Sequence, residues 1–250
     1  MKKTAYILAA AMIIAALSGC NGNTGDAETT KAPEGGKVTQ VIYQNEEKED
    51  TTAEALEFLK TQVPLFTKYL ETRMQYPLTY EVEIENEDGT VQTAAIYIKD
   101  EKNICLSSTD SFGKLTSSIY TPEMTYIVVE QDKTIYTRES NEDDIRKLVA
   151  NNLLKIDADE AKAMSYVDDY DYFKGVLYKH EIIYTQPGVG THYFYDENSE
   201  ELVYIATSTS TTRVTKLNNQ VTESAFELPA GYKTMTLSEY FEKEAEQAAQ

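Results

Sequence analysis

The chain has 250 residues, of which 41% are apolar, and its 42 acidic and 23 basic side chains give a formal net charge of -19. This composition is typical of a globular protein and excludes a disordered polyampholyte and a multi-span membrane protein. The acidity argues against a nucleic-acid partner, because a phosphate backbone binds to a face rich in lysine and arginine.

The N-terminus has the pattern of a secretory signal. A basic start, Met1-Lys2-Lys3, precedes an apolar stretch over residues 5–17, which is shorter than the ~20 residues that a membrane-spanning helix needs. The stretch ends in Leu17-Ser18-Gly19-Cys20, which resembles a bacterial lipobox. The resemblance implies a signal peptide over residues 1–20, lipid attachment (diacylglycerol, palmitate) at Cys20, and a location on the extracytoplasmic face of the cell membrane. The alternative is an ordinary signal peptide with a chance cysteine at the cut.

Residues 21–50 are rich in glycine, threonine, glutamate and asparagine and end in an acidic run. This composition predicts a flexible acidic tether that holds the rest of the chain off the membrane. Residues 38–43, Val-Thr-Gln-Val-Ile-Tyr, are consistent either with disorder or with an added edge strand. Residues 51–250 then form one domain, which is long enough to bury about 70% of the surface of its unfolded chain.

Four helices are expected. Residues 55–74 carry one apolar stripe, and Pro64 within it predicts a kink or a break near residues 61–63. A capping box at Ser140-Asn141-Glu142-Asp143 starts a second helix. Asp157 caps a short third helix that runs through Met164, and Thr236 to Glu239 cap a last helix that bears Leu237, Tyr240 and Phe241.

The remainder alternates between apolar and polar side chains, as strands do. The predicted strands are 78–85, 91–99, 103–109, 117–120, 124–130, 133–138, 175–185, 191–196, 201–209 and 213–217. Tight turns such as Asp88-Gly89 join them into an antiparallel meander. The fold class is therefore α+β, with a strongly curved antiparallel sheet or open barrel packed on helices.

The first three strands each place their apolar side chains on one face. We predict that these side chains form one wall of an apolar cavity that binds a hydrophobic ligand, covered by the helix with Leu56, Leu59, Val63 and Phe66. The candidate ligand-binding residues are Tyr80, Val82, Ile84, Ile96, Ile98, Ile104 and Leu106.

No catalytic or metal motif is found in the sequence, so we predict no enzymatic activity, no metal and no cofactor. His180 and His192 lie in strands, where they either pair as metal ligands or, as we favour, are ordinary strand residues. Residues 168–171, Asp-Asp-Tyr-Asp, fail the calcium-loop pattern and are predicted to be an exposed acidic loop. Cys105 lies in a strand-like context and is predicted to be a small buried hydrophobic residue.

The order of these elements resembles the LolA/LppX-like lipoprotein carrier superfamily over residues 51–236. Residues 193–196 followed by 201–205 are similar to an aromatic-strand, acidic-turn, Leu-Val-strand hairpin of that family, and Phe226-Glu227-Leu228-Pro229-Ala230-Gly231-Tyr232 is similar to its closing segment. The resemblance implies an open half-barrel with helices over its concave face and an apolar cavity for acyl chains or other lipids. The chain differs from the soluble carriers of the family in having its own predicted anchor.

Two functions follow from these observations. The first is a membrane-anchored monomer that binds a hydrophobic or amphiphilic ligand, such as a lipid or acyl chain. The second is a module with a filled interior that binds an envelope protein or senses the envelope. A deep dry cavity would favour the first function, and a packed interior with an exposed aromatic patch would favour the second. Several of the 19 tyrosines fall in strands, where they either line a pocket or suit a sheet with one solvated face.

Overall fold

A computed structural model describes residues 50–110 and 112–239 of the chain. The predicted signal peptide, with Cys20, and the tether up to residue 49 lie outside the described residues. The helices are α2 (Thr52–Gln62), α3 (Pro64–Arg73), α4 (Glu142–Asn152), α5 (Ala158–Ala163) and the 3-10 turn η1 (Glu223–Phe226). The strands are β1 (Leu78–Asn86), β2 (Val91–Asp100), β3 (Asn103–Thr109), β4 (Leu115–Tyr120), β5 (Met124–Val129), β6 (Thr134–Glu139), β7 (Ser165–Phe173), β8 (Val176–Gln186), β9 (Val189–Tyr195), β10 (Leu202–Ala206), β11 (Ser210–Asn218) and β12 (Lys233–Thr236). Within these ranges no helix is both long and apolar enough to cross a membrane.

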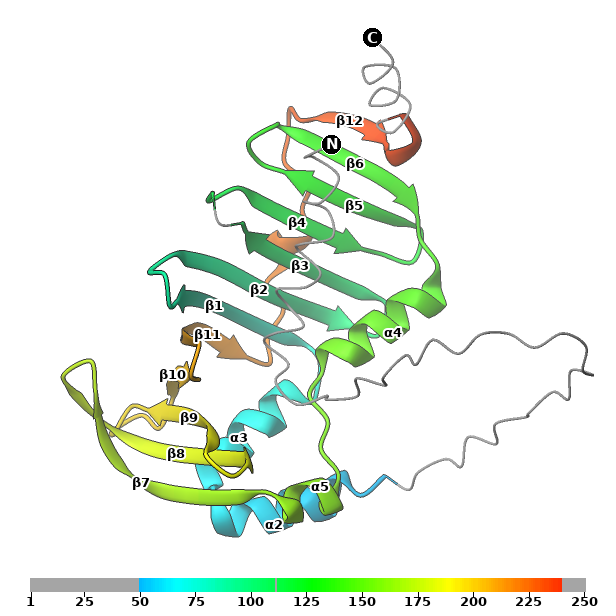
Figure 1. Cartoon of the computed structure of the whole chain (residues 1–250). Coiled ribbons are helices and arrows are strands. Elements are labelled where there is room, and N and C mark those ends of the chain that lie inside the picture. Colours follow the sequence, from blue (N-terminus) through cyan, green and yellow to red (C-terminus); the bar gives the residue numbers. More distant parts are fainter. Residues whose placement is uncertain (1–49, 111, 240–250) are drawn as a thin grey trace, which may run out of the picture.

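All twelve strands form one sheet in the order β12-β6-β5-β4-β3-β2-β1-β11-β10-β9-β8-β7 (Figure 1). Two antiparallel meanders, β1–β6 and β7–β11, are joined by the pairing of β1 with β11, and only β12 is parallel to its neighbour, β6. The α+β class and the antiparallel meander are therefore confirmed. The predicted strong curvature is wrong, because the sheet is not strongly curled. Separate layers of chain cover its two faces, so it buries its apolar side chains without closing on itself.

Local sequence signals account for the helices. Helix α2 ends at Gln62 and Pro64 is the first residue of α3, as the proline predicted. Helix α4 is capped by Asn141, whose side chain accepts hydrogen bonds from the backbone N–H groups of the second and third helical residues. The predicted start at Ser140 was one residue early, because the Ser140 hydroxyl bonds instead to Thr125 on β5. Asp157 caps α5 as expected.

The last helical start is also present. Glu239 accepts from the backbone N–H of Thr236, and Thr236 accepts from that of Glu239, so the two form the expected capping box. Tyr240 and Phe241, which were predicted to follow in that helix, lie outside the described residues.

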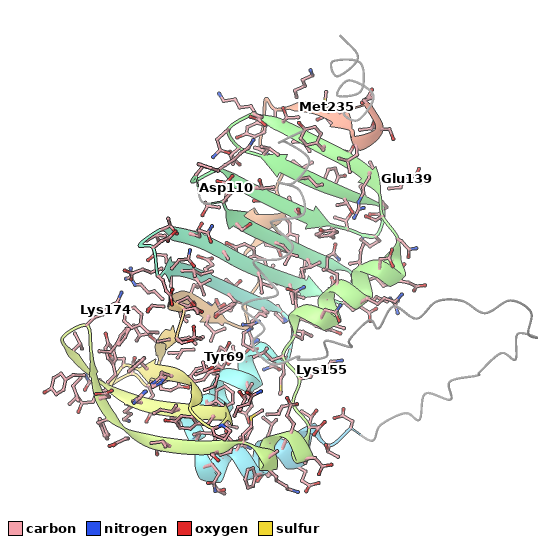
Figure 2. The ribbon with its side chains drawn as sticks, in the orientation of Figure 1. Tyr69, Asp110, Glu139, Lys155, Lys174 and Met235 are labelled. Atoms are coloured by element: carbon pink, nitrogen blue, oxygen red, sulfur yellow. The ribbon has the colours of Figure 1, made fainter. Side chains whose placement is uncertain are left out.

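The predicted acidic loop at residues 168–171 is wrong, because these residues lie inside strand β7. Strand β7 pairs with β8 along its full length, from Ser165 opposite Tyr184 to Phe173 opposite Val176. The turn between them is formed by Lys174 and Gly175, which both have positive φ (49° and 82°), as tight hairpins require. Lys174 marks the tip of this hairpin in Figure 2. Pairing over nine residues thus overrides the low strand propensity of aspartate.

Three apolar clusters hold the layers together. On the helix side, β1–β3 pack against α4, while α2, α3 and α5 pack against β8–β10. Leu217 on β11 contacts both of these clusters. On the opposite side, the segment 219–232, which we call the strap, connects β11 to β12. It places Ala225, Phe226 and Tyr232 on a cluster of Cys105, Ile119, Val128 and Ile135. The strap contains the predicted closing segment, which thus has a packing role.

Candidate functional site

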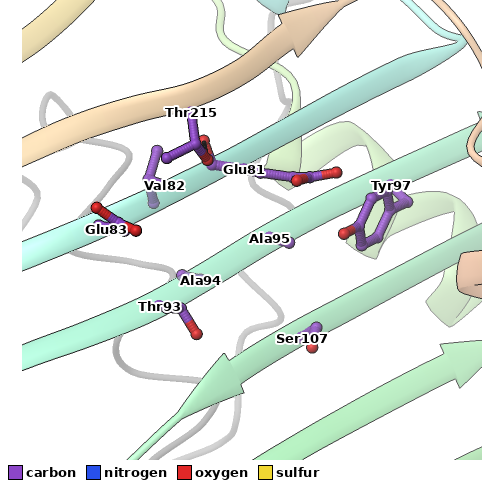
Figure 3. A pocket seen from close by; sticks show the side chains of 9 residues that line it. All are labelled: Glu81, Val82, Glu83, Thr93, Ala94, Ala95, Tyr97, Ser107 and Thr215. Carbon is purple, nitrogen blue, oxygen red and sulfur yellow. Dashed lines mark hydrogen bonds between the residues drawn. The ribbon is translucent and has the colours of Figure 1, made fainter.

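Two pockets lie on the strap side of the sheet. The smaller, of about 210 Å³, is lined by residues of β1, β2, β3 and β11 that include Glu81, Glu83 and Tyr97 (Figure 3). The larger, of about 620 Å³, lies between the strap and the β3–β5 region, and its lining includes Cys105 and Glu130. Of the seven predicted ligand-binding residues, only Val82 lines either of these two pockets.

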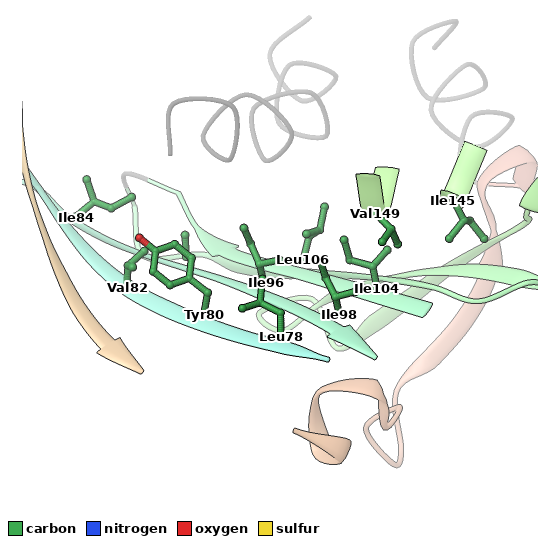
Figure 4. Packing of buried hydrophobic residues seen from close by; sticks show 11 residues of the cluster. Leu78, Tyr80, Val82, Ile84, Ile96, Ile98, Ile104, Leu106, Ile145 and Val149 are labelled. Atoms are coloured by element: carbon green, nitrogen blue, oxygen red, sulfur yellow. The ribbon is translucent and has the colours of Figure 1, made fainter. Parts of the chain in front are cut away.

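The seven predicted residues share the opposite, helix-facing side and form one buried cluster (Figure 4). Cross-strand pairing places Tyr80 opposite Ile96 and Ile96 opposite Leu106, so the three strands contribute to one continuous apolar face. From helix α4, Ile145 and Val149 belong to this cluster and Leu148 packs against it. That these side chains bind a ligand remains a prediction.

The predicted cover of this face was wrong. Leu59, Val63 and Phe66 belong to the second cluster, where α2 and α3 pack against α5 and Ile183 of β8. The N-terminal helices therefore cover the β8–β10 part of the sheet, and α4 covers the β1–β3 part. Periodicity identifies the apolar stripe of a helix but not which part of a sheet it meets.

A buried arginine lies where the two helix-side clusters meet. Arg73, in the last turn of α3, is 1% exposed and forms no ion pair with any carboxylate of the described residues. Its Nη1 donates to Tyr69 Oη and its Nη2 to the backbone oxygen of Asn152 at the end of α4, both at 3.3 Å. The guanidinium carbon lies 4.1 Å from the centre of the Tyr80 ring, and the Arg73 Nε has no hydrogen-bond partner among the described residues.

Two buried tyrosines lie near buried charges, Tyr80 at Arg73 and Tyr195 at Glu181 of β8. Tyr80 and Tyr195 are each 1% exposed, and neither hydroxyl makes a hydrogen bond of good geometry to any of the described residues. Burial raises the pKa of both well above the ordinary value, so both stay protonated and keep a donor available. Tyr69, whose hydroxyl accepts from Arg73, lies on α3 where the helix meets the sheet (Figure 2).

A buried glutamate lies at the other end of α3. Glu181 on β8 is fully buried, and its two carboxylate oxygens accept from the backbone N–H groups of Leu65 (2.9 Å) and Phe66 (2.5 Å). Burial raises the pKa of Glu181, and the two hydrogen bonds partly oppose that shift. Helix α3 thus has an anion at its N-terminus and the Arg73 cation in its last turn, the arrangement that the helix dipole favours.

Neither buried charge is among the residues predicted from the sequence. Arg73 follows Phe66 and Leu70 at helical spacing, so a charged residue on the apolar stripe was a usable signal. Glu181 gave no comparable signal, because its partners are 115 and 116 residues away in the chain.

The two histidines contact each other. His180 Nε2 and His192 Nδ1 are 3.0 Å apart, and the His180 ring stacks on Phe194 with 4.4 Å between ring centres. Burial, and then the neighbouring His192, lower the pKa of His180. No group of three or more metal-ligating side chains is found in the part of the chain that the structure describes.

Cys105 is buried at 1% exposure in the strap-side cluster, as predicted. Burial raises the pKa of its thiol to about 12. A thiol with this pKa is protonated at neutral pH and is therefore a poor nucleophile.

No protein-family model matches the chain, and no curated protein sequence matches it. Solved structures are similar at low identity. An uncharacterized conserved protein from Thermus thermophilus has 4% identity and a TM-score of 0.37, over 68% of this chain and 99% of that one. MucB in the Pseudomonas aeruginosa MucA/MucB complex has 12% identity and a TM-score of 0.33, over 74% of this chain and 64% of MucB. A LolA superfamily protein from Nitrosomonas europaea has 8% identity and a TM-score of 0.27, over 72% of this chain and 99% of that one.

Proposed function

We propose that this protein is a lipoprotein, held by a lipid on Cys20 at the extracytoplasmic face of the cell membrane, that binds an amphiphilic ligand between its helices and the helix-facing side of its sheet. The anchor rests on the lipobox-like residues 17–20. The ligand class rests on the polar centre around Arg73.

The observation that carries the proposal is a buried cation at the end of an apolar face. Tyr80 connects the apolar face with the buried cation. It is one of the seven clustered residues, and its ring lies under the Arg73 guanidinium. Burying a charge without a counter-ion is unfavourable, and with its five donors Arg73 makes only two hydrogen bonds to the described residues. A carboxylate or phosphate head group would supply the missing acceptors, while its acyl chain would lie against Ile96 and Leu106.

A second candidate function is a protein-interaction or envelope-sensing module with a filled interior. It is favoured by the packing of Ile145 and Val149 onto the seven-residue cluster, and by the position of both described pockets on the opposite side. It is also favoured by exposed aromatic side chains on β7, Tyr170 and Tyr172.

Native mass spectrometry of protein purified from its own membrane would distinguish the two candidates. A retained lipid with an acidic head group is expected for the amphiphile-binding protein, whereas protein free of lipid supports the filled interior. In a parallel fluorescence assay, palmitate should bind at least ten-fold more tightly than hexadecanol, because only the acid can pair with Arg73.

Variants make this assay specific. Arg73→Met should remove the preference for the acid while the protein stays folded by circular dichroism. Ile98→Asp should abolish uptake of both ligands, and Glu83→Gln, on the opposite face, should leave uptake unchanged. Equal binding of acid and alcohol by the unmodified protein would reject the role of Arg73. Cys20→Ala should release the protein from membranes, and a processed variant that stays membrane-bound would contradict the anchor.

A further inference from the structure

Strand β7 is the free end strand of the sheet, opposite the end formed by β12 (Figure 1). Among the residues that the structure describes, its only strand partner is β8. Six consecutive residues of β7, 167–172, are exposed, so the strand presents both faces as well as one edge to solvent. An end strand of this length is a template for another strand unless it is protected.

The protection at this edge comes from the strand's own carboxylates. Asp169 accepts a hydrogen bond from the backbone N–H of Tyr170 at 2.8 Å, and Asp171 accepts from that of Tyr172 at 2.7 Å. In an antiparallel end strand, alternate residues direct their N–H groups away from the neighbouring strand. Tyr170 and Tyr172 are such an alternate pair, so the two aspartates occupy the donors that an added strand would use.

These carboxylates have no lysine or arginine counter-ion within the described ranges. Asp171 lies 4.0 Å from His180 Nδ1, and burial together with His192 lowers the pKa of His180, which is therefore neutral at pH 7. The nearby cations are paired elsewhere, Lys174 with Glu85 at 2.6 Å and Lys179 with Glu200 at 2.8 Å. The edge is therefore an uncompensated negative strip in a chain of net charge -19.

The same strand exposes large apolar side chains. Val167 is 41% exposed, Tyr170 52% and Tyr172 72%. Val176, which follows the hairpin turn on β8, is 51% exposed. Because side chains alternate along a strand, the two tyrosines lie on one face and Val167 lies on the other with Asp169 and Asp171. An added strand with alternating basic and apolar side chains would match this pattern.

We infer that the free edge of β7 binds an extended, basic segment of a partner protein as an added strand. Lysine or arginine side chains of the segment would pair with Asp169 and Asp171 and draw these carboxylates away from the backbone. The N–H groups of Tyr170 and Tyr172 would then donate to the carbonyl groups of the segment. This interaction is independent of any ligand bound near Arg73.

Fluorescence anisotropy with the purified full chain and synthetic octapeptides tests this inference. A peptide that alternates lysine and valine should bind at least ten-fold more tightly than one that alternates glutamate and valine, and its binding should weaken as salt rises. The double variant Asp169→Asn, Asp171→Asn should weaken binding at least ten-fold. Glu123→Gln, which removes an exposed acid between β4 and β5, should not change it.

Backbone pairing needs a separate measurement, because charge alone would also produce these differences. Two versions of the basic peptide are compared, one N-methylated at its odd residues and the other at its even residues. Each version has lost the backbone N–H donors along one edge of the peptide strand, and the two versions differ only in which edge that is. A ten-fold difference between them is expected for strand addition, whereas equal affinities would overturn it. If the chain instead associates with itself at this edge, the same aspartate substitutions would change that self-association. This result would assign the edge to a second copy of the chain and would also overturn the inference.

Discussion

Glu181 offers a sharp test of how this domain tolerates buried charge. The perturbation is a pair of substitutions, Glu181→Gln and Glu181→Ala, at a fully buried carboxylate that accepts from Leu65 and Phe66 at the start of α3. Glutamine keeps the size of the side chain and one carbonyl acceptor but removes the charge. Alanine removes both acceptors and leaves two buried N–H groups without a partner.

The two variants should differ clearly in stability at pH 7. Each unsatisfied buried N–H group costs about 1–3 kcal/mol, so alanine should lower the free energy of unfolding by about 2–6 kcal/mol. Glutamine resembles the protonated acid, and the raised pKa of Glu181 means that the fold tolerates the neutral form better than the carboxylate. Glutamine also leaves one of the two N–H groups without an acceptor, so Glu181→Gln should lower the free energy of unfolding at pH 7 much less than Glu181→Ala, by no more than about 1 kcal/mol.

The assay is urea unfolding between pH 4 and pH 8. Because the folded-state pKa lies above the ordinary 4.5, the folded protein holds this proton more readily than the unfolded chain. The contribution of Glu181 to stability is thus greatest below pH 4.5 and falls as the pH rises through the folded-state pKa. The glutamine variant should lack this fall. If Glu181→Gln instead lost more than about 1 kcal/mol at pH 7, the net effect of the buried charge would be stabilising and the reasoning would fail.

Two further groups give predictions of the same kind. The Cys105 thiol, with its pKa raised to about 12 by burial, should resist iodoacetamide in the folded protein at pH 8 and react after unfolding in urea; rapid labelling of the native state would refute its burial. For His180, the lowered pKa means that the unfolded chain binds the proton more readily, so stability should fall as the pH drops below about 6.5. His180→Phe, which keeps a ring to stack on Phe194, should flatten this dependence in urea unfolding between pH 5 and pH 8, and an unchanged slope would assign it to another group.

Local signals predicted the elements of this fold better than their contacts. The break before Pro64 and the alternation of Tyr80, Val82 and Ile84 are properties of short segments, and both are found in the structure. The edge strand β7 was missed because its aspartates have low strand propensity, and only pairing with β8 specifies it. The cover of β1–β3 by α4 was missed because it depends on how the chain crosses the sheet.

For the candidate site, too, the features within short segments could be predicted and the long-range contacts could not. That Ile96 and Leu106 share a face with Tyr80 follows from the two-residue period of strands, and the pairing confirms it. The polar centre could not be predicted, since it brings together the end of α3, the end of α4 and strand β1. Arg73 and Asn152, for example, are 79 residues apart in the chain.

The pairing of β1 with β11 has a consequence for the order in which the protein can fold. Glu83 and Arg213, which form an ion pair across this junction, are 130 residues apart in the chain. At 5–20 residues per second, a ribosome needs roughly 7–26 seconds to synthesise the chain between them. During that time β1 has only β2 as a partner, and its other edge is open to non-native pairing. The junction makes the two meanders one cooperative unit, and this edge of the first meander stays unpaired until the second has been made.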